Sequence, residues 1–213
     1  MNDEGAREAV ERLWKEGKRK KSEPIPREPE ELSRQELTHS LRAKGLPRER
    51  AKRIADEIDH LQDLANWYSE DIDWYDVGEH EARTFLVVPL IEALGWDEKR
   101  VRIEWERKDA VLFDGPYSKK SKPLILIESK RLGHGLGDAP DQAVKYAESN
   151  LTCDRLVVTD GIRYNLFTKL TPFGGWSFSD YLNICDLTGA HRYNPDVAGA
   201  VSFLLKMLPK GAA

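Results

Sequence analysis

Apolar residues recur every three or four positions through residues 31–68, which is the spacing of amphipathic helices. The spacing continues on both sides of a Gly-Leu-Pro turn at 45–47, so the sequence predicts a pair of helices over 31–68. Ser33 followed by Glu36 predicts a capping box at the start of the first helix. The apolar residues that define the pair are Leu37, Leu41, Ile54, Ile58 and Leu61.

The pattern changes beyond this helical pair. A helical stripe over 79–94 ends at Gly95, a residue that suits a helix C-terminus, and short strand-like runs follow. The predicted strands are 101–106, 109–113, 124–128, 156–159 and 163–168, with a helix over 141–149 before the fourth of them. Asp160-Gly161 between the last two strands predicts a hairpin. For 172–213 we expect a loop with a final helix over 197–208.

This order of elements indicates an α/β fold with a small mixed central sheet flanked by helices. We expect a flexible N-terminal arm and linker over 1–30, a helical region over 31–76 and an α/β domain over 77–213. The total of 213 residues fits one ordinary domain with an appendage.

Composition narrows the class of protein. The net charge is -4, whereas many nucleic-acid-binding domains are strongly basic overall. The acidic excess lies in residues 61–116, which hold 6 basic and 14 acidic residues. The segments on either side of it can therefore still bind a polyanion. Cys153 and Cys185 form no CxxC pair, and no apolar run is long enough for a membrane span or a signal peptide. We therefore expect a cytoplasmic protein without membrane contact.

The candidate catalytic residues follow the most apolar of the predicted strands. Residues 123–127 predict a strand buried on both faces, and it ends in Glu128-Ser129-Lys130. Residues two apart in a strand share a face, so Glu128 and Lys130 leave the strand together. Asp109 opens the preceding strand, and antiparallel pairing would bring it beside Glu128. Two neighbouring carboxylates favour a hard cation such as Mg²⁺ or Mn²⁺, which suits metal-assisted phosphodiester hydrolysis aided by a lysine.

The helix over 79–94 carries a further acid on its apolar stripe. Glu79 falls within this stripe, whereas Glu81 lies on the opposite side. Two interpretations stay open: a catalytic role for Glu79, or a partly buried ion pair with Arg83 one turn later. Pro89 removes a backbone donor in mid-helix and predicts a kink there.

Five elements stand in a recognisable order: the segment 79–97, Asp109, the run 127–130, Gln142 with Tyr146, and the run 158–161. Together they resemble the N-terminal nuclease domain of type I restriction enzyme R subunits, which belongs to the PD-(D/E)xK nuclease superfamily. The resemblance covers roughly residues 77–170 and implies a restriction-endonuclease-like core. It also implies Mg²⁺ or Mn²⁺ as cofactor, DNA as substrate, and other restriction or defence subunits as candidate partners.

The resemblance assigns roles residue by residue. Asp109 and Glu128 match the metal ligands, with the backbone carbonyl of Ser129 joining them, and Lys130 matches the lysine of the signature. Glu79 matches the acid of the first helix. The helix after the signature supplies the matching Gln142, with Tyr146 on the same face as a candidate substrate contact. The chain departs from the pattern in having Lys108 and Ala110 around the aspartate, and serine where alanine is usual at 129.

Two remaining motifs limit the function. The Gly-rich run 133–137 does not fit a dinucleotide fingerprint, because its sixth position is Asp138, and we interpret it as a loop whose His134, like Arg83, is a candidate for substrate contact. No GxxxxGK[ST] motif occurs, so the chain carries no ATPase motor of that kind. Two functions remain open. One is a Mg²⁺-dependent DNA endonuclease of restriction or anti-phage type whose helical region binds DNA or a partner; the other is a non-catalytic binding module that retains the nuclease fold. Either is compatible with a homo-oligomer.

Overall fold

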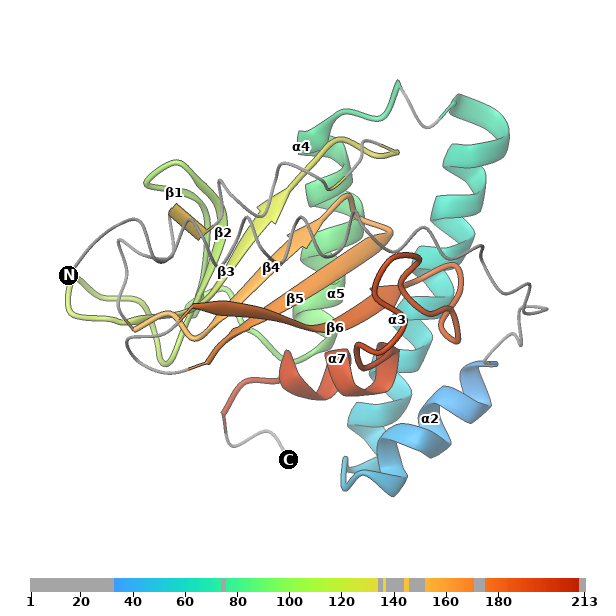
Figure 1. Cartoon of the computed structure of the whole chain (residues 1–213), viewed down its shortest axis with the longest axis horizontal. Helices are drawn as coiled ribbons and strands as arrows, with labels where there is room; N and C mark the ends of the chain where they lie inside the picture. The colour runs from blue at the N-terminus through green and yellow to red at the C-terminus, as the bar shows by residue number, and fades with distance from the viewer. Residues whose placement is uncertain are drawn as a thin grey trace.

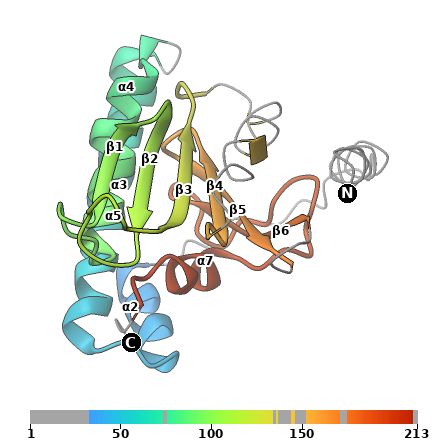
Figure 2. The same cartoon turned by 90° about the vertical axis from the view of Figure 1, so that its left-hand side faces the viewer.

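The structure, a computed structural model, describes residues 33–73, 76–133, 136, 144–145, 152–170 and 175–210. Among these residues a six-stranded mixed sheet, in the order β1-β2-β3-β4-β5-β6, forms the centre and helices flank it (Figures 1 and 2). The fold is α/β with a mixed central sheet, as the order of elements predicts. The arm predicted over 1–30 lies outside the described residues.

The predicted helical pair is confirmed as α2 (Arg34–Ala43) and α3 (Arg48–Trp67), and a short π-helical segment, η1 (Tyr68–Ile72), follows. The capping box also forms, because the Glu36 N–H donates to Ser33 Oγ at 3.3 Å and the Ser33 N–H donates to Glu36 Oε2 at 2.8 Å. Buried side chains of α2 and α3 belong to the same hydrophobic cluster as those of the sheet. The boundary predicted after residue 76 therefore does not separate two cores.

The helix predicted over 79–94 consists of α4 (Glu79–Ala82), a π-helical turn η3 (Arg83–Val87) and α5 (Val88–Ala93). Pro89 has no N–H to donate to the turn before it, and the Val88 N–H donates to the Arg83 carbonyl, five residues earlier. A π turn thus stands next to the predicted kink. The helix ends as predicted at Gly95, whose φ of +99° suits glycine.

Five of the six strands match the predicted ones. All neighbouring pairs are antiparallel except β3 with β4, which is parallel. The strands are β1 (Val101–Trp105), β2 (Lys108–Phe113), β3 (Pro123–Ser129), β4 (Arg155–Thr159), β5 (Arg163–Lys169) and β6 (Trp176–Asn183). The predicted hairpin between β4 and β5 is confirmed. Of the helix predicted over 141–149, only Val144 and Lys145 are described, and both are helical.

The sixth strand corrects the sequence analysis, which assigned residues 176–183 to a loop. Asp180 interrupts the apolar alternation of β6, yet its side chain is fully buried. Lys206 Nζ donates to Asp180 Oδ2 at 2.6 Å and Ser202 Oγ donates to Oδ1 at 2.5 Å. Both donors lie on α7 (Ala200–Lys206), which confirms the predicted final helix. The sequence analysis missed this strand because the acid within it is buried through contacts with a helix further along the chain.

Helices α3, α4 and α5 lie on one side of the sheet (Figures 1 and 2). The larger hydrophobic cluster fills the space between these helices and the sheet, and Trp96 is its largest buried side chain. A smaller cluster, which includes Leu126, Leu156 and Val158, covers the opposite face of the central strands. Within the described part of the chain, no helix combines the length and apolarity that a membrane crossing requires.

Candidate active site

Strands β2 and β3 bring two acids to one end of the sheet. They pair antiparallel with Ala110 opposite Ile127, and continuing this register by one residue sets Asp109 opposite Glu128. Directly opposed residues of an antiparallel pair lie roughly 5 Å apart at their Cβ atoms. The sheet therefore places the two predicted metal ligands on neighbouring strands at the same level.

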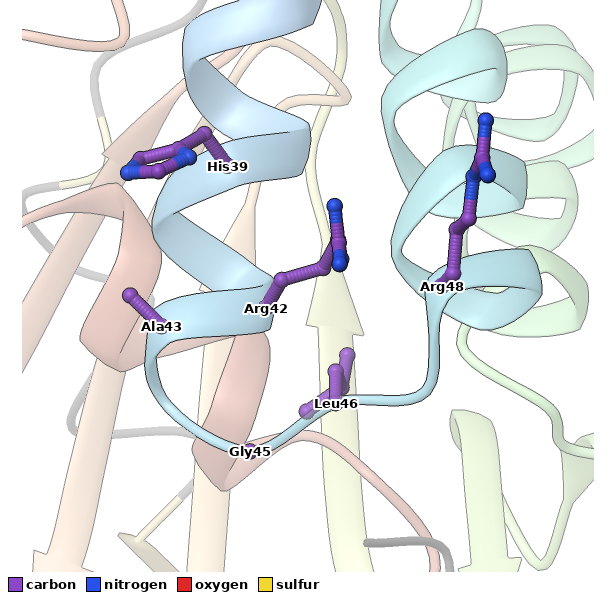
Figure 3. A pocket seen from close by; sticks show the side chains of 6 residues that line it. All are labelled: His39, Arg42, Ala43, Gly45, Leu46 and Arg48. Atoms are coloured by element: carbon purple, nitrogen blue, oxygen red, sulfur yellow. The ribbon is translucent and has the colours of Figure 1, made fainter.

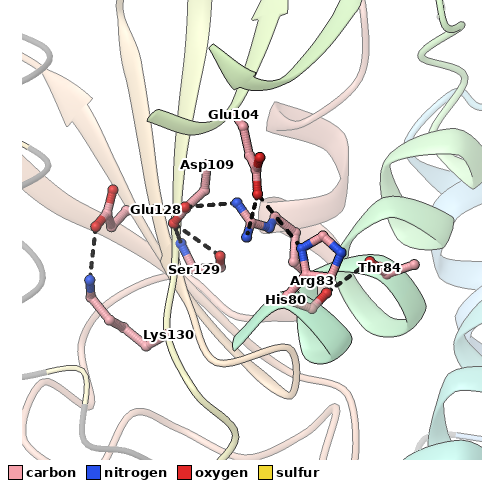
Figure 4. Close-up of polar contacts among 8 residues, drawn as sticks. All are labelled: His80, Arg83, Thr84, Glu104, Asp109, Glu128, Ser129 and Lys130. Carbon is pink, nitrogen blue, oxygen red and sulfur yellow. Dashed lines mark hydrogen bonds and ion pairs between the residues drawn. The ribbon is translucent and has the colours of Figure 1, made fainter. Parts of the chain in front are cut away.

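The end of β3 holds a buried acid and its counter-ion. Glu128 is 3% exposed, and Lys130 Nζ donates to its Oε1 at 2.8 Å (Figure 4). This contact confirms that residues 128 and 130 point to the same side of the strand. The Lys130 N–H also donates to the Thr159 carbonyl at 2.7 Å, which fixes the backbone of the lysine beside β4.

Asp109 has partners on both of its carboxylate oxygens. The Ser129 N–H and Oγ donate to Asp109 Oδ2 at 2.6 and 3.0 Å, and Arg83 Nη1 donates to Oδ1 at 2.8 Å. Figure 4 shows Asp109 between the Glu128–Lys130 pair and Arg83. Asp109 thus links the end of β3 to the π-helical turn.

The position of Arg83 removes one of the two interpretations of the first helix. Its guanidinium is buried and forms ion pairs with Asp109 and with Glu104 rather than with Glu79. The alternative of a Glu79–Arg83 ion pair is therefore wrong, and a catalytic role for Glu79 stays a prediction. Asp109 lies 26 residues further along the chain, so helical spacing could not indicate that it would compete for the guanidinium. The role of Arg83 in substrate contact stays a prediction.

Glu79 stands half-buried at the first position of α4. Its charge contributes to the raised pKa of both Glu128 and Lys130, which places it within electrostatic reach of the pair. Glu81 is exposed and accepts a hydrogen bond from the Tyr68 hydroxyl at 3.0 Å. Glu79 is thus the more buried of the two acids and Glu81 is exposed, as their positions on the helix predict.

The surroundings of Glu128 disfavour its ionised form. Burial raises its pKa most strongly, and the charges of Asp109 and Glu79 raise it further, whereas the hydrogen bond from Lys130 lowers it. Burial alone would lower the pKa of Lys130, but the hydrogen bond to Glu128 and the nearby carboxylates outweigh it and raise the pKa. Three acids thus share this end of the sheet with Lys130 and Arg83.

Two buried atoms of this site have no hydrogen-bond partner among the described residues: the Oε2 oxygen of Glu128 and the Nε nitrogen of Arg83. A buried, unpaired carboxylate oxygen is costly, and a cation is the kind of group that compensates it. The donor set of carboxylate oxygens suits Mg²⁺ or Mn²⁺. Asp109 can join such a site because each carboxylate oxygen has a second lone pair. The residues present therefore fit a divalent cation.

Glu104 is a neighbour that the sequence analysis did not single out. Its Oε1 lies 3.4 Å from Arg83 Nη2 and 3.6 Å from His80 Nδ1 (Figure 4). Its φ of +53° is in the left-handed region, as are those of Glu106 and Arg107 in the β1–β2 turn. No motif in the sequence signals this conformation, because it depends on the packing of the hairpin.

Three predicted site residues, Gln142, Tyr146 and His134, lie outside the described residues. In the described ranges, no group of three or more His, Cys, Asp or Glu side chains is close enough to hold a metal ion. A metal at Asp109 and Glu128 would thus depend on backbone carbonyl and water oxygens for its other ligands, as expected for a Mg²⁺ site with few protein carboxylates.

Comparison with models of protein families, with curated proteins and with solved structures gave no significant match to this chain. The resemblance to the restriction-enzyme nuclease domain is therefore a prediction from the residues themselves. What the chain can do has to be argued from its own geometry.

The Glu128→Gln variant should gain stability over the wild type as the pH rises. The pKa of Glu128 is raised in the folded chain, so folding favours the protonated acid; this contribution is complete below the unfolded pKa and is lost as the pH rises through the folded pKa. A glutamine has no such loss. Urea denaturation between about pH 4 and pH 8 should show the difference in unfolding free energy moving in favour of the variant.

The matched control is Glu98→Gln, which changes an exposed acid on the loop before β1. Its difference from the wild type should stay nearly constant over the same pH range. A constant difference for Glu128→Gln as well would contradict the unfavourable ionisation of Glu128.

Proposed function

We propose that this protein is a metal-dependent DNA endonuclease that hydrolyses phosphodiester bonds. The observation that carries the proposal is the buried Glu128 Oε2, which has no hydrogen-bond partner among the described residues. Glu128 stands opposite Asp109 in register, and its other oxygen accepts a hydrogen bond from Lys130. A buried acid with a free oxygen, a second acid on the next strand and a nearby lysine are the parts that such hydrolysis needs.

Asp109 and Glu128 would hold the divalent cation, with the backbone carbonyl of Ser129 as a further ligand. The bound ion would supply Lewis-acid stabilisation of the phosphate and a lower pKa of a coordinated water. Among the chain's own residues, Lys130 is positioned by its 2.8 Å contact with Glu128 Oε1 to direct a water or to stabilise developing negative charge. Glu79 adds negative charge that keeps Lys130 protonated.

The proposal includes the finer assignments from the resemblance. The α/β sheet and its flanking helices would form a restriction-endonuclease-like core, and the protein would act in restriction or anti-phage defence without an ATPase motor of its own. Gln142 would complete the catalytic set, and Tyr146 and His134 would contact substrate. A cytoplasmic location and partner subunits of such systems belong to the same proposal.

The deciding experiment is a nuclease assay of the purified chain across metals and substrates. With Mg²⁺ or Mn²⁺ we expect nicking of plasmid DNA, and EDTA should stop it. Single-stranded DNA and RNA substrates in parallel would define the substrate class. No cleavage of any substrate with either metal would overturn the proposal.

Metal binding should also raise the melting temperature. An ion that binds the folded chain alone stabilises it by about 2.7 kcal/mol when its concentration is 100 times its Kd. Mg²⁺ or Mn²⁺ should therefore raise the melting temperature of the wild type in differential scanning fluorimetry, but not that of Glu128→Gln. Equal shifts in both proteins would mean that the ion binds elsewhere.

A second function has its own observation. Both oxygens of Asp109 already accept hydrogen bonds from Arg83 and Ser129, an arrangement that would also serve a purely structural aspartate. A binding module that retains the fold would fit this arrangement. DNA binding by the wild type without any cleavage in Mg²⁺ or Mn²⁺ would favour it.

A further inference from the structure

The turn between α2 and α3 forms a pocket that the proposed active site does not use. We call it the turn pocket; it is lined by His39, Arg42, Ala43, Gly45, Leu46 and Arg48 (Figure 3). Its floor is apolar, because Leu46 is buried, whereas Arg42 and Arg48 at its sides are exposed. The pocket thus combines a buried leucine with two exposed guanidinium groups.

The cations of the turn pocket have no acidic partners. Among the described residues, neither Arg42 nor Arg48 forms an ion pair or a side-chain hydrogen bond, and neither does the neighbouring Lys44. Other basic side chains on the same two helices are paired: Arg34 and Lys52 both contact Asp56, at 2.5 and 2.7 Å. The unpaired charges are therefore concentrated at the turn.

The charge distribution along α3 opposes the requirements of helix stability. Residues 48–53 of α3 hold four basic residues and one acid, whereas the acids of α3 other than Glu49 lie after residue 55. Cations near a helix N-terminus and anions near its C-terminus interact unfavourably with the helix dipole. The fold does not require this arrangement. Sequence choices that work against local stability are expected where a surface has another role.

The exposed atoms around the turn pocket indicate the class of ligand. Two planar guanidinium groups beside one cavity suit the oxygens of a phosphate group. Insertion into a lipid surface would need large apolar side chains at the rim, but the large exposed hydrophobic residues of the described chain all lie outside 33–53. A phosphate polymer in solution therefore fits the turn pocket better than a lipid surface.

We infer that the turn pocket binds a backbone phosphate of DNA and serves as a docking site separate from the catalytic one. The choice of DNA rests on the proposed function; the pocket itself does not. The site residue Glu79 begins α4, and α4 lies at the other end of α3, because Tyr68, just after the last residue of α3, contacts Glu81 on α4. Twenty residues of α-helix span about 30 Å, so the phosphate held here is not the one that would be cleaved.

The test compares two double variants of the full chain. Arg42→Gln with Arg48→Gln removes both guanidinium groups of the pocket; Arg34→Gln with Lys52→Gln removes the same charge from the same helices at paired positions. Binding of a labelled 24-base-pair duplex is measured by fluorescence polarisation in EDTA, over a range of salt concentrations. EDTA prevents metal-dependent cleavage from affecting the result.

We expect the pocket variant to lose at least about fivefold in affinity at 0.1 M salt. The slope of log affinity against log salt should also become shallower by roughly 0.9, since the pocket neutralises one phosphate and each lost phosphate contact contributes about 0.9. The control variant should keep the wild-type slope. The melting temperature of the pocket variant should change little, because losing Arg48 removes an unfavourable interaction with the N-terminus of α3 and losing Arg42 removes a favourable one with the C-terminus of α2.

An unchanged slope in the pocket variant, or an equal loss in both variants, would overturn the inference. Binding of anionic vesicles or of a phosphopeptide through the same two arginines, with no binding of DNA, would overturn it as well. The outcome is distinguishable from failure of the proposed nuclease. A chain that never cleaves DNA but shows the expected change in slope would lose its proposed activity and keep this docking site.

Discussion

Replacing Lys130 by Ala should reduce Mg²⁺-dependent nicking of plasmid DNA by at least about 100-fold, and replacing Asp109 by Ala should reduce it to background. Lys130 Nζ contacts Glu128 Oε1 at 2.8 Å, beside the carboxylate oxygen that is proposed to bind the metal. Asp109 supplies the second acidic group of the proposed metal site. Rates of supercoiled plasmid loss at saturating Mg²⁺ measure both effects.

The two variants need different controls. Lys130→Ala removes the hydrogen bond to the buried Glu128, so its thermal unfolding must be checked, and Lys119→Ala on the exposed loop before β3 is the matched surface change. Asp109→Ala leaves the buried Arg83 without its closest acid, so its thermal unfolding must be checked. The Asp109→Asn variant retains a hydrogen-bond acceptor and should still lack activity. Full activity of both alanine variants, with cleavage by the wild type, would reject the assignment of these residues.

Replacing Asp160 by Ala should destabilise the protein by about 3–5 kcal/mol, a large share of the stability of a typical domain. The Asp160 side chain is fully buried and accepts hydrogen bonds from the backbone N–H groups of Ile162 and Arg163, at 3.2 and 2.8 Å. It also forms an ion pair with the Arg163 guanidinium. The variant would leave a partly buried cation and two backbone donors without this acceptor.

Equilibrium urea denaturation measures this effect, and Asp154→Ala is its control. Asp154 is exposed and contacts Arg155 at 3.0 Å at the start of β4, an interaction expected to contribute less than about 1 kcal/mol. If both variants lost the same small amount of stability, the buried network at the β4–β5 turn would not stabilise the fold as its contacts indicate.

Much of the fold could be predicted because its signals are local. The capping box at Ser33, the glycine at position 95 and the Asp160-Gly161 turn each act within a few residues, and all three are confirmed. Strand β6 was missed because Asp180 interrupts its alternation. The two side chains that satisfy Asp180 lie 22 and 26 residues away. A local pattern carries no information about such partners.

The candidate site likewise combines features that local sequence predicts with contacts between residues far apart in the chain. The shared face of Glu128 and Lys130 follows from strand geometry, and the structure confirms it. Helical spacing left a Glu79–Arg83 ion pair open as one alternative, but the antiparallel sheet brings Asp109 to Arg83 instead. Glu104 was not considered, since its position depends on a left-handed backbone in the β1–β2 turn. Metal binding and catalysis remain predictions.

The π turn over Arg83–Val87 has a consequence for how this protein can change by insertion or deletion. A π turn holds one more residue than an α turn, so deleting one residue within it would restore α-helical phase. One π turn and one α turn each complete a single rotation, so such a deletion would leave α4 and α5 on their present faces. Deleting one residue from the α-helical part of α5 would instead rotate α4 by about 100° relative to the rest of α5 and turn Glu79 and Arg83 away from the strand ends. The π turn is therefore the position in this helix where the loss of one residue should be tolerated.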